Sequence, residues 1–88
     1  MSCEVLQDYL NDGWILVDVR EPHEFGYAKI KGAINVRLSE IDSLNVNNKY
    51  LLYCRSGSRS EMAVKHLRSK GFTVLNAGGI GSYSKCTD

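Results

Sequence analysis

The sequence lacks the features of a membrane, secreted or nucleic-acid-binding protein. No apolar segment approaches the roughly 20 residues that span a bilayer. Residues 1–4 have neither a basic region nor the start of an apolar signal segment. Lys and Arg (11) nearly balance Asp and Glu (10), and the formal net charge is +1, so no strongly basic surface is available for nucleic acid or anionic lipid. We therefore expect a cytoplasmic protein with no nucleic-acid partner and no membrane partner.

Cysteine is scarce as well. The chain has three cysteines, Cys3, Cys54 and Cys86, an odd number at wide spacing. This pattern argues against a disulfide framework and against a zinc site of the CxxC type, so we expect no metal. In a reducing compartment free thiols are the default. The sequence then poses the question of which thiol is chemically special.

The 88 residues suffice for one small domain, which we expect to span residues 1–88, and 43% of them are apolar. Apolar runs of strand length alternate with segments of helical spacing, and no tight hairpin signal separates them. The pattern predicts an α/β fold: an open parallel sheet of about four or five strands with helices on both faces. The expected strands are 14–19, 33–36, 49–53 and 72–75.

One cysteine stands where an expected strand ends and an expected helix begins. Cys54 follows the apolar run 50–53, and a helix is predicted to start with Ser58 as N-cap and Glu61 as its capping-box partner. In an open parallel sheet, ligands bind beyond the carboxyl ends of the strands. Cys54 lies at such an end, and so does Asp18.

The residues after Cys54 suit a loop that curls around its sulfur. Gly57 tolerates a positive φ, which lets backbone N–H groups point inward. The small serines supply hydroxyl donors and the arginines supply positive charge, while the positive end of the helix dipole favours an anion. We expect these groups to lower the pKa of the Cys54 thiol and to stabilise its thiolate. The residues that would surround the sulfur in this way are Arg55, Ser56, Gly57, Ser58 and Arg59.

Two reactions fit such a cysteine: transfer of a sulfane sulfur through a persulfide, and phosphoryl or arsenyl chemistry through a cysteinyl intermediate. A phosphatase cradle has the pattern Cys-x5-Arg, whereas Arg59 gives Cys-x4-Arg here and position 60 is Ser. Tyr53 also replaces the His that usually precedes a phosphatase cysteine. The shorter loop favours a sulfur atom over a phosphate ion.

The loop 54–60 resembles the active-site loop of single-domain rhodaneses, which are thiosulfate sulfurtransferases. Further matching segments occur in the order typical of that family: 16–20 with Glu24 and Phe25, 30–36, and 71–72 followed by 78–80. The resemblance implies the rhodanese fold, a persulfide intermediate on Cys54 and substrate contact through residues 55–59. Two departures lie away from the nucleophile: Ala28-Lys29-Ile30-Lys31-Gly32-Ala33 replaces Gly-His-Ile-Pro-Gly-Ala, and Tyr83 takes the usual position of a Trp.

The resulting hypothesis is a sulfurtransferase that needs no cofactor. It moves sulfur from thiosulfate or a persulfide to a thiol, cyanide or protein acceptor. Two alternatives stay open: a non-enzymatic sulfur-carrier or docking module, and, less favoured, a phosphatase or arsenate reductase of related fold. Asp18 and Arg20 are expected to form an ion pair rather than to act in catalysis. Cys86 is expected to be a surface thiol rather than the partner that resolves a Cys54 persulfide.

Overall fold

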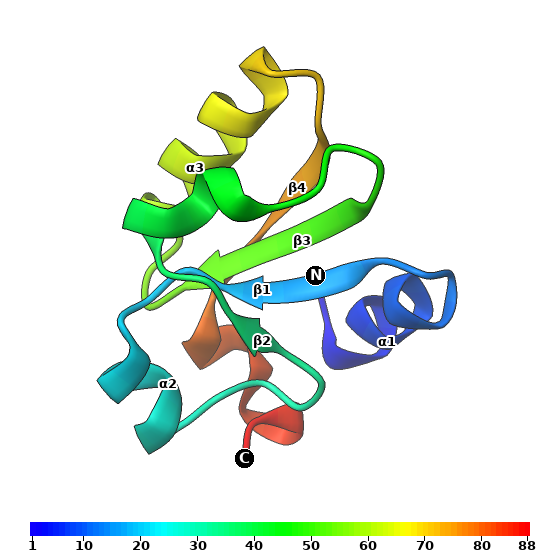
Figure 1. Ribbon diagram of the computed structural model, residues 1–88. Coiled ribbons are helices and arrows are strands. Elements are labelled where there is room, and N and C mark those ends of the chain that lie inside the picture. Colours follow the sequence, from blue (N-terminus) through cyan, green and yellow to red (C-terminus); the bar gives the residue numbers. More distant parts are fainter.

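The computed structural model describes residues 1–88 and shows an α/β arrangement around one sheet (Figure 1). Its elements follow in the order α1 (Cys3–Asn11), β1 (Ile15–Asp18), α2 (Pro22–Tyr27), β2 (Ile34–Asn35), η1 (Leu38–Ser43), β3 (Lys49–Cys54), α3 (Ser58–Ser69), β4 (Thr73–Gly79) and η2 (Ile80–Cys86). The two η elements are 3₁₀ helices.

The sheet has four strands in the order β2-β1-β3-β4, and every neighbouring pair is parallel. The predicted fold class is therefore confirmed, with the smaller of the two expected strand numbers. One strand differs from expectation. The last strand, expected over 72–75, continues as β4 through Gly78 and Gly79, which pair with Tyr53 and Cys54 beyond a register shift.

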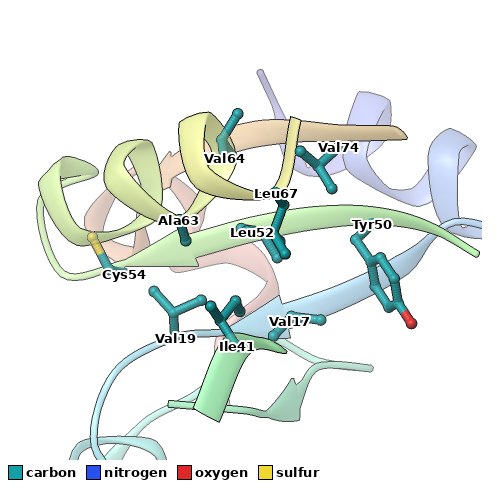
Figure 2. Packing of buried hydrophobic residues seen from close by; sticks show 10 residues of the cluster. All are labelled: Val17, Val19, Ile41, Tyr50, Leu52, Cys54, Ala63, Val64, Leu67 and Val74. Carbon is teal, nitrogen blue, oxygen red and sulfur yellow. The ribbon is translucent and has the colours of Figure 1, made fainter. Parts of the chain in front are cut away.

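Helices cover both faces of the sheet, and strand periodicity decides which residues each face receives. On β3, alternate residues from Tyr50 to Cys54 face the cluster formed with α3 and η1 (Figure 2). The intervening Leu51 and Tyr53 face a second cluster, to which Leu6 of α1 and Tyr83 of η2 belong. Both faces of β3 are thus buried, which explains its continuous apolar run.

The order of the strands places the functional edge of the sheet. The chain passes from β1 outward to β2 on one side and then crosses to β3 on the other side. The direction of winding therefore reverses between β1 and β3, and a crevice for a ligand is expected beyond the carboxyl ends of these two strands. Those ends are Asp18 and Cys54, which bears out the expectation that both lie at this edge.

The expectation of free thiols at both chain ends is wrong. Cys3, at the start of α1, and Cys86, at the end of η2, form a disulfide, with their Cα atoms 6.1 Å apart across a sequence separation of 83. Both residues pack against the cluster under α1 and η2. The wide spacing that argued against a disulfide is irrelevant once the fold brings the two ends together. Cys54 is the single free cysteine.

None of the helices combines the length and the apolar character that spanning a bilayer would require.

Candidate active site

The sulfur of Cys54 is enclosed by the loop that follows it. Cys54 ends β3 and is only 1% exposed, with its side chain turned toward the first turns of α3 (Figure 2). The Gly57 N–H donates to the sulfur over 3.0 Å, and the Ser60 N–H does so over 3.4 Å. The Ser60 hydroxyl oxygen lies 3.5 Å from the same sulfur. The predicted ring of donors around this one thiol is present.

These donors act against the effect of burial. Burial in the protein raises the pKa of Cys54, because an ion loses water there. The hydroxyl and backbone N–H of Ser60 lower that pKa, and the N–H groups of Gly57 and Ser56 lower it further. The net pKa of Cys54 lies below its ordinary value. The site therefore favours the thiolate, which is the nucleophilic form of a cysteine.

The shape of the loop depends on Gly57. Its φ of +96° lies in the left-handed region, and Gly57 is the N-cap of α3 with no side-chain cap. The predicted capping box of Ser58 and Glu61 is therefore wrong. Ser58 is instead the first residue of the helix, and its hydroxyl lies 3.2 Å from that of Ser56. A glycine cap lets the backbone turn its N–H groups toward the sulfur, which a conventional serine cap would not do.

Strand β4 lies directly against this loop. A Cβ atom added to Gly79 would lie 2.6 Å from the carbonyl oxygen of Arg55 and 3.2 Å from the Cα of Ser56. A Cβ on Gly57 would meet the Cα of Gly78 at 3.4 Å. Gly79 is thus required because two backbone segments approach closely. Gly78 is suited to its place for a different reason: its φ of +95° lies in the left-handed region, while a Cβ there would meet nothing within 4 Å.

The two arginines of the loop differ in their surroundings. Arg59 forms a two-pronged ion pair with Glu24 of α2, with both N–O distances at 2.9 Å. The hydrogen bond from Arg59 is the main reason why the pKa of Glu24 falls to about 2. Arg55 is exposed and forms no ion pair. The positive charge beside the loop is therefore balanced at Arg59 and free at Arg55.

The carboxyl end of β1 carries a second, deeper ion pair. The guanidinium of Arg20 donates to Asp18 over 2.6 Å and 3.0 Å, and both residues are buried. The backbone N–H of Arg20 also donates to the same carboxylate, over 2.8 Å. The ion pair expected between Asp18 and Arg20 is present. It fixes the turn that leads from β1 into α2.

A pocket of about 520 Å³ lies between α2 and the loop. One wall comes from the end of β1 and from α2, and the others come from Arg55 and from the residue that follows β4. Tyr27 stands at the pocket with 92% of its surface exposed. No group of three or more His, Cys, Asp or Glu residues is placed to hold a metal ion. The lining residues are Arg20, His23, Glu24, Tyr27, Ala28, Arg55 and Ile80.

The sequence did not indicate every residue at this site. Asn76 of β4 accepts a hydrogen bond from the Ser60 hydroxyl over 2.7 Å, and its amide donates to the Gly57 carbonyl over 3.2 Å. Glu24 pairs with an arginine 35 positions away. Asn76 lay outside the expected strand 72–75, and Glu24 was named only as part of the family resemblance, without a partner. A local pattern gives no signal for either contact, because each depends on how separate elements pack.

Comparison with known proteins finds a matching family model and several curated relatives. The model of the rhodanese-like domain family matches residues 2–86. The thiosulfate sulfurtransferase PspE of Escherichia coli is 34% identical over 71 residues, which cover 73% of this chain and 68% of PspE. Other curated relatives are longer, since the match spans 36% of YrkF and 66% of YtwF, both from Bacillus subtilis.

Solved structures agree with this placement. A rhodanese-related protein from Thermoplasma volcanium superposes with a TM-score of 0.82 at 30% identity, covering 97% of this chain and 89% of its own. The human single-domain sulfurtransferase TSTD1 superposes with a TM-score of 0.76 at 25% identity, covering 90% and 88%. The fold, the order of the motifs and the cysteine loop all point the same way, and the chain belongs to the rhodanese-like domain family.

Proposed function

We propose that the protein is a sulfurtransferase that carries a sulfane sulfur as a persulfide on Cys54. The observation that carries this proposal is the ring of donors around one buried sulfur, from Gly57 and Ser60. Such donors stabilise a thiolate, and they offer the same bonds to the negatively charged outer sulfur of a persulfide. The names of the relatives, which include a thiosulfate sulfurtransferase, support the same chemistry.

The proposed reaction has two half-reactions. The Cys54 thiolate attacks the outer sulfur of thiosulfate; the new S–S bond forms while the old one breaks, and sulfite leaves with the bonding electron pair. In the second half-reaction a nucleophile attacks the outer sulfur of the persulfide, and the thiolate returns. The acceptor is cyanide in an assay and a thiol or a protein in the cell. Neither half-reaction needs a metal or an organic cofactor.

The loop residues receive distinct proposed roles. Arg55, as the unpaired cation beside the pocket, attracts the anionic donor. Arg59 has two proposed roles. It contacts the donor as part of the loop, and its guanidinium anchors the loop to Glu24. The backbone of Ser56, Gly57 and Ser58 surrounds the transferred sulfur. We assign the pocket next to Arg55, which Cys54 itself does not line, as the site where the donor and the acceptor approach the loop.

The direct experiment is the transfer of sulfur from thiosulfate to cyanide, followed as thiocyanate. We expect turnover by the native protein and none by Cys54→Ser. The matched controls are Cys3→Ser and Cys86→Ser, which should retain activity below their unfolding temperature. Full activity of Cys54→Ser would show that Cys54 is not the nucleophile.

A second candidate function is a sulfur-carrier or docking module. The nearly complete burial of Cys54 and the neutralised charge of Arg59 favour it, because both would slow turnover without a partner. A relative from Ogataea parapolymorpha, the adenylyltransferase and sulfurtransferase uba4, is matched over only 21% of its length, so related domains occur inside larger proteins. A mass gain of about 32 Da on Cys54 after thiosulfate treatment, without thiocyanate turnover, would select the carrier.

The cytoplasmic location expected from the sequence stays a prediction. The disulfide between Cys3 and Cys86 weighs against it, because disulfides persist mainly in oxidising compartments.

A further inference from the structure

The hydroxyl of Ser60 has more acceptors than it has protons. Ser60 is fully buried. Its oxygen lies 2.7 Å from the side-chain oxygen of Asn76, 3.1 Å from the carbonyl oxygen of Gly57 and 3.5 Å from the sulfur of Cys54. A hydroxyl donates one hydrogen bond and accepts others. The three neighbours therefore compete for a single proton.

Two backbone groups fix the orientation of the Asn76 amide. The N–H of Gly78 can only donate, and it faces the side-chain oxygen of Asn76 over 2.9 Å. The carbonyl of Gly57 can only accept, and it faces the Asn76 nitrogen over 3.2 Å. The oxygen of Asn76 is therefore the atom that faces Ser60, and at 2.7 Å it must receive the hydroxyl proton.

The other oxygen acceptor is already occupied. The Gly57 carbonyl accepts from the N–H of Glu61 over 3.0 Å as well as from Asn76. A carbonyl oxygen has two lone pairs. With both engaged, it competes poorly for a third donor. The side-chain oxygen of Asn76 and the sulfur of Cys54 are therefore the two effective acceptors for the hydroxyl proton of Ser60.

We propose that Asn76 is a positioning residue of the cysteine site: its side-chain oxygen holds the Ser60 proton while Cys54 is a thiol and yields it to the sulfur when the sulfur is negatively charged. In the thiol form the Ser60 oxygen accepts from the S–H group. When the thiol proton leaves to solvent, the hydroxyl rotates and donates to the thiolate, keeping its own proton throughout. Asn76 thereby opposes ionisation of Cys54.

Replacing Asn76 with Ala leaves the charged groups around the loop unchanged. Glu61 of α3 accepts from the Asn76 amide over 3.3 Å. The remaining charges at this edge are the exposed Arg55 and two ion pairs, Arg59 with Glu24 and Arg20 with Asp18. A change in the ionisation of Cys54 on replacing Asn76 with Ala is therefore not the result of a lost or gained charge.

The experiment is a pH titration of the thiolate by its ultraviolet absorbance, with Cys54→Ser as the blank. Cys54 is the only free thiol while the disulfide is intact. In Asn76→Ala we expect the ionised fraction of Cys54 to rise roughly threefold to tenfold at a fixed pH below the midpoint, the value of one redirected hydrogen bond. A residue that merely braced the loop would have the opposite effect, because a looser loop disperses its N–H groups.

The control repeats the comparison in a Ser60→Ala background. There Asn76→Ala should leave the ionised fraction unchanged, because no hydroxyl proton remains to redirect. Three results would overturn the proposal: a decrease of the ionised fraction in the native background, no change in the native background, or an equal increase in both backgrounds.

A second variant covers a failure of Asn76→Ala to fold. Asn76→Asp keeps an oxygen toward Gly78 and Ser60, binds the hydroxyl proton more strongly and adds a negative charge. It should lower the ionised fraction roughly tenfold. A rise in this variant, or no change, would count against Asn76 in the same way. The inference concerns the site of the proposed function, but the titration contains no sulfur donor, so failure of either proposal can be told from failure of the other.

Discussion

The molecule contains two sulfur sites with opposite surroundings. Cys54 lies in a loop whose donors to the sulfur all come from residues within six positions of it. Cys3 and Cys86 lie 83 positions apart and meet only in the folded chain. The cysteine sulfur is a free thiol with a lowered pKa at the first site and part of a disulfide bond at the second. The comparison shows that the surroundings of a cysteine, and not its residue type, determine its chemistry.

The second site, the disulfide between Cys3 and Cys86, joins the two ends of the chain and is called the clasp below. Next to the disulfide, the carbonyl of Cys86 accepts from the N–H of Lys31 over 2.8 Å, and Thr87 forms an isolated bridge with Ile30. These contacts hold η2 against the face that α1 covers. We therefore expect changes in the clasp to alter stability with little effect on activity. Changes in the Cys54 loop should alter activity with little effect on stability.

The strongest test of this division is the replacement of the nucleophile. Cys54→Ser should lower sulfur transfer by at least about 1,000-fold, since a nucleophile that is removed is not replaced by its neighbours. The midpoint of thermal unfolding should stay close to that of the native protein, because serine is nearly isosteric. A large fall in stability with partial activity would blur the distinction between the two sites.

The reciprocal test removes the clasp. With both Cys3 and Cys86 replaced by Ser, the free energy of unfolding should fall by about 4 kcal/mol, because the disulfide closes nearly the whole chain into one loop. Chemical denaturation of the oxidised protein and of the double variant measures the difference. Sulfur transfer by the folded fraction should be unchanged, and a proportional loss of activity per folded molecule would contradict the separation.

A third test concerns the close contact of β4 with the loop. Gly79→Ala should lower the free energy of unfolding by about 1–3 kcal/mol and reduce sulfur transfer, because its Cβ would meet the Arg55 carbonyl at 2.6 Å. Gly81→Ala is the matched control: nothing lies within 4 Å of its Cβ, and a change within about 0.5 kcal/mol is expected. Equal effects of the two substitutions would show that the loop can move away from β4.

The smallest expected effect is that of the ion pair between α2 and the loop. The pKa of Glu24 is lowered to about 2 from an ordinary 4.5, mainly by its hydrogen bond with Arg59. A lowered pKa in the folded state means that the pair stabilises the protein above the ordinary pKa, and that this contribution disappears as the pH falls toward about 2. Compared with the native protein, Glu24→Gln should lose at most about 1 kcal/mol at neutral pH, since the pair is partly exposed.

The pH dependence gives this last prediction its sign. The difference in unfolding free energy between the native protein and Glu24→Gln should shrink between pH 4.5 and about 2, as measured by denaturation at several pH values. A difference that grows as the pH falls through this range would show that the pair does not hold the loop.

Much of the architecture was predictable because it rests on local patterns. Continuous apolar runs predicted the parallel strands, and Cys54 followed one of them, so its place at the carboxyl edge needed no knowledge of the tertiary structure. The positive φ of Gly57 was also expected from its position in the loop. By contrast, the N-cap of α3 was predicted wrongly as Ser58, whereas it is Gly57. Both residues are suited to an N-cap, and the sequence did not distinguish them.

The sequence by itself determined that a cysteine would stand between a strand and a helix, among small residues able to turn N–H groups toward its sulfur. Only the tertiary structure decided that Cys3 would meet Cys86, that Asn76 would face Ser60 and that Glu24 would bind Arg59. The physical reason is range. Backbone conformation and periodicity act over a few residues, whereas these contacts require separate elements to be packed within a few ångströms of one another.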